Sequence, residues 1–317
     1  MNSEKILVLM STYNGEKYLV EQVESIFNQK GNYDISLLIR DDGSNDMTIN
    51  IIQKLKEKYK KIKFIKGSNL GCNGSYFELF KLAYKEDFDF FAISDQDDIW
   101  LDDKISKALY YIQNYDQNQP ILYGSASYLV RDDKIPYGKT QTANKEISVF
   151  NTIIQNFFPG HSQVFNRALL QYLIVDIDVS NIYVYDSWIT NIANNFGKVI
   201  FDNEPHTLYR MHERNVVGYG KSQIQWLKTR INRMKKGDII RQTQQIEYFL
   251  EVYGKKLNQT FLNEMNFFLV SRKNIFSRLK YIVQCKLYRQ KTIETIYFKA
   301  LYLFGKYNHH LKEGYKI

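Results

Sequence analysis

The first hundred residues alternate between short apolar runs and amphipathic stretches, and this alternation constrains the fold more than any other feature. Residues 6–10 (Ile-Leu-Val-Leu-Met) form a continuous apolar run, which is typical of a strand buried on both faces of a parallel sheet. The next stretch has apolar residues at the helical spacing i, i+4, i+7 and i+8, namely Leu19, Val23, Ile26 and Phe27. Strands and helices in this order predict a parallel sheet with helices on both faces.

The alternation continues along the chain and becomes less regular after Pro120. Further strands are expected at residues 36–40, 63–65, 88–94, 121–130, 198–201 and 207–210. Further helices are expected around residues 49–55, 77–82 and 186–195, with loops at 67–74 and 139–145. From Gln223 onward helical periodicity dominates, with Ile224, Leu227 and Ile231 as its first apolar positions.

A polar cluster follows each of the first four predicted strands. The clusters are Thr12-Tyr13-Asn14, Asp41-Asp42, Asn69-Leu70-Gly71 and Asp95-Gln96-Asp97-Asp98. In open α/β sheets, ligands bind at the carboxyl ends of the strands, so topology alone predicts a binding crevice here. The glycine-rich patterns G-x-G-x-x-G and G-x-x-x-x-G-K-[ST] are both absent. Phosphate binding would therefore depend on a metal held by acids.

Three carboxylates lie within four residues at Asp95-Gln96-Asp97-Asp98. Carboxylate oxygens are the ligands that Mg²⁺ and Mn²⁺ prefer, and substrate phosphates and waters usually complete the coordination. The alternative is an acidic loop that caps a helix starting near Leu101, with Asp102 and Asp103 as charges at the helix N-terminus.

The ordered set of motifs resembles the family-2 glycosyltransferases, which have the nucleotide-sugar-binding fold known as GT-A. The motifs are Ser11-Thr12-Tyr13-Asn14, Asp41-Asp42-Gly43-Ser44, Asn69-Leu70-Gly71, Ser94-Asp95-Gln96-Asp97-Asp98-Ile99-Trp100, Phe158-Pro159-Gly160-His161, Tyr185-Asp186-Ser187-Trp188 and the run 209–218. The resemblance covers residues 4–218, and the run 95–100 looks most like the rhamnosyltransferase-type branch. It implies an α/β fold with a mostly parallel, Rossmann-like sheet and flanking helices, and the helical periodicity after Gln223 adds a C-terminal helical region.

The resemblance also implies roles for individual residues. Nucleotide-sugar contacts would come from Thr12, Tyr13, Asn14, Asp42, Asn69, Gly71 and Asp95. A divalent cation, Mg²⁺ or Mn²⁺, would be held by Asp97, Asp95 and His212, and Asp186 would be the catalytic base. Trp100, His161 and Trp188 would line the pocket for the donor or acceptor sugar, where an aromatic face can stack on a sugar ring.

These roles agree with the chemistry of sugar transfer. Breaking a sugar–diphosphate bond leaves negative charge on the departing group, which a divalent cation neutralises. The acceptor hydroxyl needs a carboxylate positioned to take its proton. One base and one metal suffice for a single inverting displacement. The Q-x-x-R-W motif of processive synthases is absent, which favours addition of one sugar per binding event.

Structural alternatives stand beside several of these assignments. Asp186 can be a charge stabilised by a helix N-terminus, and His212 can be a structural histidine. Asp41 can cap its turn, and both tryptophans can belong to the core. Many relatives carry His where this chain has Tyr185, and His161 stands where small or polar residues are usual.

The charge is unevenly distributed along the chain. Residues 1–220 hold 23 Lys and Arg against 28 Asp and Glu, whereas residues 221–317 hold 20 against 6. This break predicts a catalytic domain at 1–220 and a basic, aromatic-rich helical region at 221–317, with linker residues near Gly218 to Lys221. Basic amphipathic helices bind anionic bilayers. The alternative is a helical subdomain with a solvated basic face, and no motif supports nucleic-acid binding.

The expected function follows from these observations together. The two cysteines match neither a disulfide framework nor a zinc site, and no uninterrupted apolar run reaches the length of a membrane-spanning helix. The apolar run within residues 1–10 is too short for us to expect a secretory leader there. We expect a cytoplasmic enzyme, peripheral at the inner face of the plasma membrane. It would transfer one sugar, rhamnose from dTDP-rhamnose, onto a lipid-linked intermediate of a bacterial surface or capsular polysaccharide. The alternatives are a UDP-sugar (Gal, Glc or GlcNAc) transferase, or a non-catalytic nucleotide- or glycan-binding protein docked to a membrane.

Overall fold

The computed structural model describes residues 3–140, 142–212, 232 and 234–308 of the 317-residue chain. The chain forms two compact units. The first consists of Met1–Ala143, Phe157–Ser180 and Val184–Gly220, and the second of Asn144–Asn156, Asn181–Tyr183 and Lys221–Ile317. Residues 144–156 lie within the first domain expected from the sequence but group with the C-terminal helices. The division at residue 220 stays a prediction, because its expected linker lies outside the described residues.

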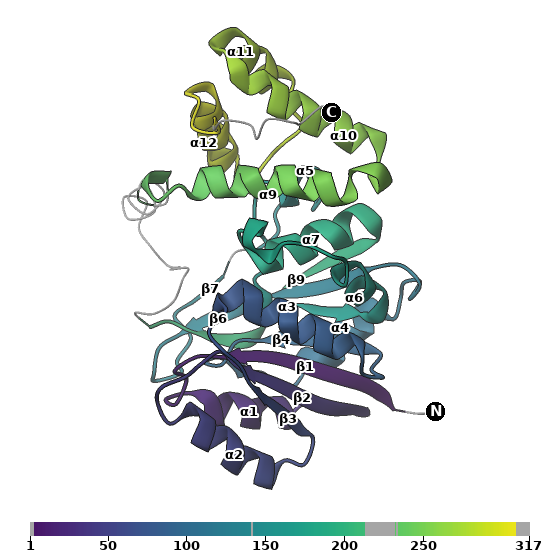
Figure 1. Ribbon diagram of the computed structural model, residues 1–317, viewed down its shortest axis with the longest axis vertical. Helices are drawn as coiled ribbons and strands as arrows, with labels where there is room; N and C mark the ends of the chain where they lie inside the picture. The colour runs from purple at the N-terminus through teal and green to yellow at the C-terminus, as the bar shows by residue number, and fades with distance from the viewer. Residues whose placement is uncertain (1–2, 141, 213–231, 233, 309–317) are drawn as a thin grey trace. The chain divides into compact units, whose positions relative to one another are not determined.

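The first unit is built around one mixed sheet (Figure 1), which has nine strands among the described residues. The strand order is β3-β2-β1-β4-β8-β6-β9-β5, and β7 pairs with β6. Strands β1 to β4 pair in parallel, β8 is antiparallel to β4 and β6, and β6 is parallel to β9. The mostly parallel α/β fold expected from the sequence is confirmed. The strands are β1 (Glu4–Thr12), β2 (Tyr33–Asp41), β3 (Ile62–Lys66), β4 (Phe90–Ser94), β5 (Ile99–Trp100), β6 (Ile121–Val130), β7 (Gly138–Lys139), β8 (Val164–Asn166) and β9 (Lys198–Arg210).

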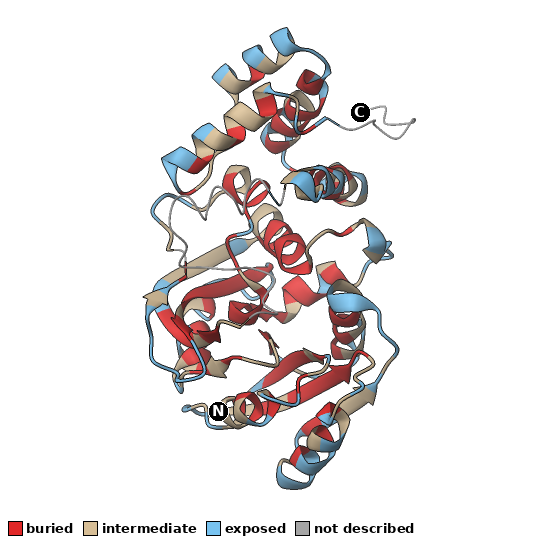
Figure 2. Ribbon diagram, turned by 90° about the vertical axis from the view of Figure 1, so that its left-hand side faces the viewer, coloured by how far each residue is buried: buried red, intermediate tan, exposed pale blue. Residues whose placement is uncertain are grey.

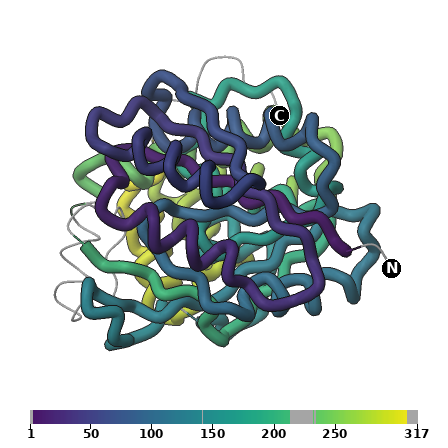
Figure 3. Tube along the Cα trace, turned by 90° about the horizontal axis from the view of Figure 1, so that it is seen from below, coloured from purple at the N-terminus to yellow at the C-terminus, as the bar shows by residue number. Residues whose placement is uncertain are grey.

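Helices cover both faces of this sheet, as expected. The helices of the first unit are α1 (Leu19–Phe27), α2 (Thr48–Lys58), α3 (Gly71–Tyr84), α4 (Lys104–Ile112), α6 (Arg167–Leu173) and α7 (Tyr185–Phe196). Alternate residues of a strand point to opposite faces, so Val8 and Met10 of β1 form one core with Val23, Ile52 and Ile105 from α1, α2 and α4. In the view from below, α1 and α2 face the reader (Figure 3).

The opposite face of the sheet is covered by α3, α6 and α7, which contact one another. Leu7 and Leu9 of β1 are buried on this side, under α3. The ring of Phe165 in β8 lies 5.7 Å from that of Phe91 in β4 and 6.3 Å from that of Phe80 in α3. The central strands β1 and β4 are accordingly buried on both faces (Figure 2), which is why residues 6–10 form an unbroken apolar run.

Three local features differ from the sequence-based expectation. The strands expected at 198–201 and 207–210 are one continuous strand, β9, because a register shift opposite Ser125 and Ala126 accommodates Pro205. The loop expected at 67–74 ends early, since α3 starts at Gly71. The short strand β5 was not predicted, and its antiparallel pairing with Thr207 and Leu208 places the acidic cluster beside the end of β9.

The second unit is helical, which confirms the helical C-terminal region. The helices among its described residues are α5 (Val149–Thr152), α9 (Asp238–Tyr253), α10 (Gln259–Val270), α11 (Ile275–Gln284) and α12 (Thr292–Leu303). Single-turn 3-10 helices in the described part of the chain are η1 (Gly160–Ser162), η2 (Val179–Asn181), η3 (Gly254–Lys256) and η4 (Ser271–Lys273). The rings of Tyr281, Tyr302 and Tyr307 pack around Phe268. The apolar positions Ile224, Leu227 and Ile231 lie outside the described residues. No described helix is long and apolar enough to cross a membrane.

Candidate active site

The carboxyl ends of β1 and β4 are tied together by one side chain. The Gln96 side chain accepts a hydrogen bond from the backbone N–H of Tyr13 at 2.9 Å and donates one to its carbonyl oxygen at 3.1 Å. A Cβ atom on Gly15 would lie 2.2 Å from Gln96 Oε1, so only glycine leaves room for this contact. The Tyr13 side chain is half exposed. Two polar clusters that are 83 residues apart in the sequence thus meet at one sheet edge.

Asp97 and His212, both predicted to hold a metal, lie side by side. His212 Nε2 is 2.8 Å from Asp97 Oδ2, and the imidazole stacks on the ring of Tyr18. Arg210 fixes the acidic loop by donating from Nε to the carbonyl of Asp97 and from its backbone N–H to Asp98 Oδ1. The motif run 209–218 continues beyond His212 into residues, Asn215 among them, that lie outside the described part of the chain.

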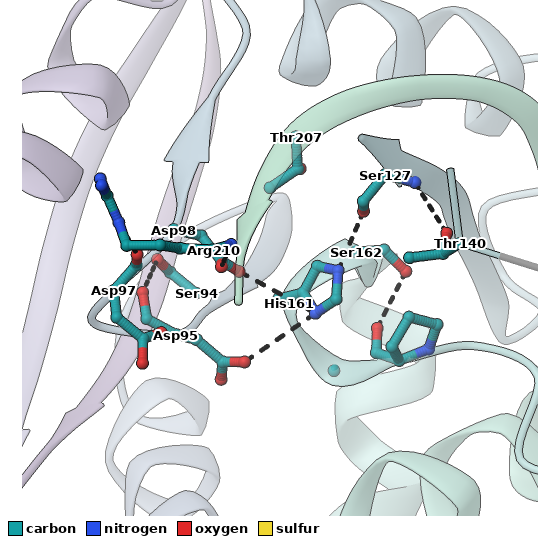
Figure 4. Close-up of polar contacts among 12 residues, drawn as sticks. Ser94, Asp95, Asp97, Asp98, Ser127, Thr140, His161, Ser162, Thr207 and Arg210 are labelled. Atoms are coloured by element: carbon teal, nitrogen blue, oxygen red, sulfur yellow. Dashed lines mark hydrogen bonds and ion pairs between the residues drawn. The ribbon is translucent and has the colours of Figure 1, made fainter. Parts of the chain in front are cut away.

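His161 lies between two further carboxylates (Figure 4). Its Nδ1 atom is 3.9 Å from Asp95 Oδ2 and 3.9 Å from Asp98 Oδ2, while Nε2 lies 2.9 Å from the hydroxyl of Ser127. One ligand atom from each of Asp95, Asp98 and His161 falls within 4.8 Å of the others. Asp98 is fully buried, and its Oδ2 atom accepts no hydrogen bond from any described residue. This buried, unsatisfied oxygen and the excess of carboxylates fit a bound divalent cation.

The acids of this cluster have perturbed pKa values. Burial, together with the charges of Asp97 and Asp186, raises the pKa of Asp95 to about 7. Burial and the neighbouring carboxylates raise the pKa of Asp98 well above its usual range. Burial and the charge of Lys104 lower the pKa of His161 to about 3, so its imidazole is neutral and able to act as a ligand. The cluster therefore combines groups that a cation would stabilise in their deprotonated forms.

Lys104 and Asp98 are members of the site that sequence reasoning did not assign. Lys104 is fully buried in the first turn of α4, and its ammonium group donates to the carbonyl of His161 at 2.6 Å and to the hydroxyl of Thr207 at 3.0 Å. Burial lowers its pKa to about 7. The third acid in the run Asp95-Gln96-Asp97-Asp98 was a sequence signal for Asp98. Nothing in the sequence distinguishes Lys104 from a surface lysine.

Asp41 shapes the turn after β2. Its carboxylate accepts hydrogen bonds from the backbone N–H groups of Gly43 and Ser44 and from the buried hydroxyl of Thr12. Asn14, at φ 48°, accepts a hydrogen bond from the backbone N–H of Asn45 in the same region. Asp41 is therefore a capping residue, which was the structural alternative, and Thr12 faces it rather than open space.

Asp42 organises the loop before α3. Its carboxylate accepts hydrogen bonds from the backbone N–H groups of Leu70 and Gly71, both at 2.9 Å, and is paired with the buried guanidinium of Arg40. Asn69 also accepts from the N–H of Gly71, at 3.2 Å. Three residues predicted to border the nucleotide, Asp42, Asn69 and Gly71, are thus joined in one network.

Asp186 lies in the first turn of α7 and is almost completely buried. Its carboxylate accepts hydrogen bonds from the backbone N–H of Gly160 at 3.0 Å and of Ser187 at 2.7 Å. Its charge contributes to raising the pKa of Asp95. Asp186 is therefore a helix N-terminal carboxylate, as in the structural alternative, and its charge acts on Asp95 of the acidic cluster.

Tyr185, the residue before Asp186, is buried against α3. Its ring stacks on Tyr76 with centroids 4.2 Å apart, and the Tyr76 hydroxyl donates to the carbonyl of Ser94 at 3.0 Å. A Cβ atom on Gly160 would lie 2.0 Å from the Tyr185 hydroxyl oxygen. This close approach requires glycine in the Pro159-Gly160-His161 turn.

Trp100 and Trp188 were expected to line the sugar pocket, but both are buried in the core. The Trp100 ring packs in the apolar core with Lys104 above it, and Trp188 lies on α7 with no exposed surface. Neither ring presents a face on which a sugar could stack in this conformation.

The chain was also compared with known proteins. The sequence model of the family described as "Glycosyl transferase family 2" matches residues 7–173. This range includes Asp95, Asp97 and His161 but ends before Asp186 and His212. The dTDP-rhamnosyl transferase RfbG of Shigella flexneri is 32% identical over 224 residues, which are 66% of this chain and 73% of that protein.

Solved glycosyltransferase structures share the fold. Residues 1–349 of S. aureus TarS in complex with UDP match with a TM-score of 0.57 and 17% identity, covering 89% of this chain and 76% of that one. The mannosyltransferase PcManGT from Pyrobaculum calidifontis, in complex with GDP-Man and Mn2+, matches with a TM-score of 0.53 and 16% identity over 96% and 86% of the two chains. At this level of identity the likeness establishes the GT-A fold alone.

Proposed function

The chain belongs to glycosyl transferase family 2 and is a glycosyltransferase, and on this premise we propose that it transfers single rhamnose units from dTDP-rhamnose with inversion of configuration. The observation that carries the choice of donor is the 32% identity with dTDP-rhamnosyl transferase RfbG over two-thirds of this chain. The likeness to the rhamnosyltransferase-type motif at residues 95–100 supports the same donor.

In the proposed reaction the acceptor hydroxyl attacks the anomeric carbon and the nucleoside diphosphate leaves from the opposite side. Asp186 takes the proton of that hydroxyl. Its carboxylate is held by the N–H groups of Gly160 and Ser187, so it is oriented before the acceptor arrives. Asp42, Asn69 and Gly71 define the nucleoside side through their shared hydrogen bonds. Tyr13, tied to Gln96, borders the same side.

Divalent-metal dependence is part of the proposal. Asp95, Asp97 and His212 would hold Mg²⁺ or Mn²⁺, with Asp98 and His161 adjoining. Support comes from the buried, unsatisfied oxygen of Asp98 and from the presence of Mn2+ in the PcManGT structure. When bound, the cation would offset the negative charge that develops on the leaving diphosphate.

The proposed acceptor is a lipid-linked intermediate of a bacterial surface or capsular polysaccharide. The protein would then work in the cytoplasm, peripherally at the inner face of the plasma membrane. The concentration of 20 of the 43 Lys and Arg residues in residues 221–317 supports this part, because basic helices are attracted to anionic lipid headgroups.

A donor panel tests the proposal. Nucleotide release would be measured with dTDP-rhamnose, UDP-Gal, UDP-Glc and UDP-GlcNAc, with and without Mg²⁺ or Mn²⁺. We expect dTDP release from dTDP-rhamnose that depends on the cation. Turnover of a UDP-sugar instead would establish the second candidate, a UDP-sugar transferase, which the fold shared with UDP-bound TarS favours. Absence of turnover with every donor would contradict the enzymatic proposal.

A further inference from the structure

Helix α11 turns large apolar side chains outward. Phe276 is 80% exposed and Val283 is 81% exposed, and Ile275 and Leu279 are exposed as well. At 100° per residue these four positions fall within one sector of about 100°. Tyr281, on the other side of the helix, is fully buried and donates a hydrogen bond to Glu264 at 2.9 Å. The helix is thus anchored through Tyr281 and presents a continuous apolar stripe to the surroundings.

Helix α12 shows the same arrangement. Glu294, Phe298 and Tyr302 are buried on one side of it, whereas Ile293 and Ile296 are exposed. Phe304, just past the end of the helix, is 74% exposed and follows the same stripe at helical spacing. The two helices contact each other. A surface helix of a water-exposed unit normally buries its apolar stripe, so two neighbouring helices with outward apolar stripes indicate a binding surface.

The charge around these stripes is of one sign. Residues 271–308 contain nine Lys and Arg against one acid, Glu294, and Glu294 is buried. The exposed charged side chains of this stretch are Lys273, Lys280, Lys286, Lys291 and Lys306. Among its described residues the stretch therefore exposes lysines and apolar groups and no carboxylate.

The combination of exposed lysines and exposed apolar side chains distinguishes between the partners that could bind this surface. A second copy of the same face would bring lysines against lysines, which is unfavourable. A nucleic acid would pair with the lysines but would leave Phe276, Val283 and Phe304 in water. An anionic bilayer satisfies both features, because its headgroups pair with lysines while the boundary with the acyl chains accepts apolar side chains.

We propose that the outward faces of α11 and α12 form a docking surface for anionic lipid bilayers, with Phe276, Val283 and Phe304 entering the boundary between headgroups and acyl chains. The inference deepens the proposed function, since the acceptor proposed there is lipid-linked. It identifies the side chains through which the C-terminal unit meets the membrane.

The test is sedimentation of the full-length protein with vesicles of phosphatidylglycerol and phosphatidylethanolamine, compared with vesicles of phosphatidylcholine. We expect binding to the anionic vesicles, and a loss of at least about tenfold in the partition coefficient for the double variant Phe276→Asp/Val283→Asp. The matched control is Tyr110→Asp on α4, which changes a 66% exposed aromatic residue of the first unit and should bind like the wild type.

A second variant tests the contribution of charge. Lys273→Gln/Lys280→Gln/Lys286→Gln keeps the apolar stripe, and each removed charge should weaken binding to the anionic vesicles about fivefold at low salt. Either absent binding of the wild type to anionic vesicles or equal binding by the Phe276→Asp/Val283→Asp variant would overturn the proposal. So would light scattering that shows a dimer which this variant dissociates, with no vesicle binding.

Nucleotide release is measured on the same preparations without vesicles, so that the two proposals are judged separately. Turnover without vesicle binding contradicts the docking surface and leaves the proposed function in place. Vesicle binding without turnover of any donor supports the docking surface and contradicts the proposed function.

Discussion

His212 Nε2 lies 2.8 Å from Asp97 Oδ2, although the two residues are 115 positions apart in the sequence. Strand β9 makes this possible, because its end is held against the acidic loop by the pairing of β5 with Thr207 and Leu208 and by Arg210. His212, the last described residue of the first unit, is therefore held in contact with the acidic cluster.

This contact predicts that the main effect of His212→Asn is a higher requirement for the divalent cation. We expect the concentration of Mn²⁺ or Mg²⁺ needed for half-maximal nucleotide release to rise about 10-fold to 100-fold, a range typical of losing one group that orients or supplements metal ligands. The measurement is a cation titration of initial rate at saturating donor. Glu57→Gln, an exposed acid on α2, is the control. An unchanged cation requirement with a lowered melting temperature would make His212 purely structural.

Asp186→Asn is predicted to abolish transfer while leaving donor binding nearly intact. Loss of a general base costs about 10² to 10⁴ in kcat, and the amide oxygen of Asn can still accept one of the two hydrogen bonds that the backbone N–H groups of Gly160 and Ser187 donate to separate oxygens of Asp186. Single-turnover rates and calorimetric donor affinity separate the two effects. The exposed acid Asp176 supplies the matched substitution Asp176→Asn. Equal losses of rate and donor affinity would mean that Asp186 only stabilises α7.

Gly15→Ala and Gln96→Ala are predicted to have the same, non-additive effect. A Cβ atom at residue 15 displaces the Gln96 side chain, and either change breaks the two hydrogen bonds that hold the backbone of Tyr13. Each of these hydrogen bonds contributes about 1 kcal/mol. The apparent KM for the donor should therefore rise about 5-fold to 30-fold when one or both are lost. A double-mutant cycle checks the shared mechanism. Additive effects would show that Gly15 acts independently of Gln96.

His206 is predicted to make stability dependent on pH. Its ring contacts Asp103 at 2.9 Å and Asp202 at 3.2 Å. Burial lowers its pKa, but the hydrogen bonds to Asp202 and Asp103 outweigh this, so the pKa is raised overall. Because the pKa is higher in the folded state, the protonated imidazole stabilises the fold. This contribution is fully present below the unfolded-state pKa, near 6.5. It is lost as the pH rises through the folded-state pKa.

The measurement is the free energy of unfolding of wild type and His206→Gln between pH 5.5 and 9. The variant should be less stable by about 1–2 kcal/mol at pH 6, and the difference should shrink toward pH 9. A difference that stays constant over this range would contradict the role of the charged imidazole.

The sequence predicts the sheet and the acid cluster well because their signals are local. A short, unbroken apolar run such as residues 6–10 is typical of a strand that is buried on both faces. Polar residues that directly follow parallel strands lie together at the carboxyl edge of the sheet. The helical assignment of the C-terminal region likewise depends on short-range periodicity.

What the sequence does not reveal depends on contacts between distant segments. The sequence suggests that Lys104 is a solvent-exposed lysine of an amphipathic helix. In the folded protein it is buried, and its ammonium group donates to His161 and to Thr207 of β9. The position of Trp188 in the motif suggests a surface on which a sugar could stack, but its ring is completely buried in the fold. The sequence predicts two short strands at 198–201 and 207–210, whereas pairing with β6 continues through the residues between them with a shift of register, so β9 is one strand.

The second unit draws on three separate stretches of the chain, and this affects how it can be exchanged between relatives. Gln290 donates from its backbone N–H to Gln155 and from its side chain to Asn151, and Arg289 donates to the carbonyl of Ile154. A chimaera that takes only residues 221–317 from a relative would place foreign side chains against a resident α5 segment. Exchange of the second unit between relatives should therefore succeed only when residues 144–156 and 181–183 are transferred together with the C-terminal helices.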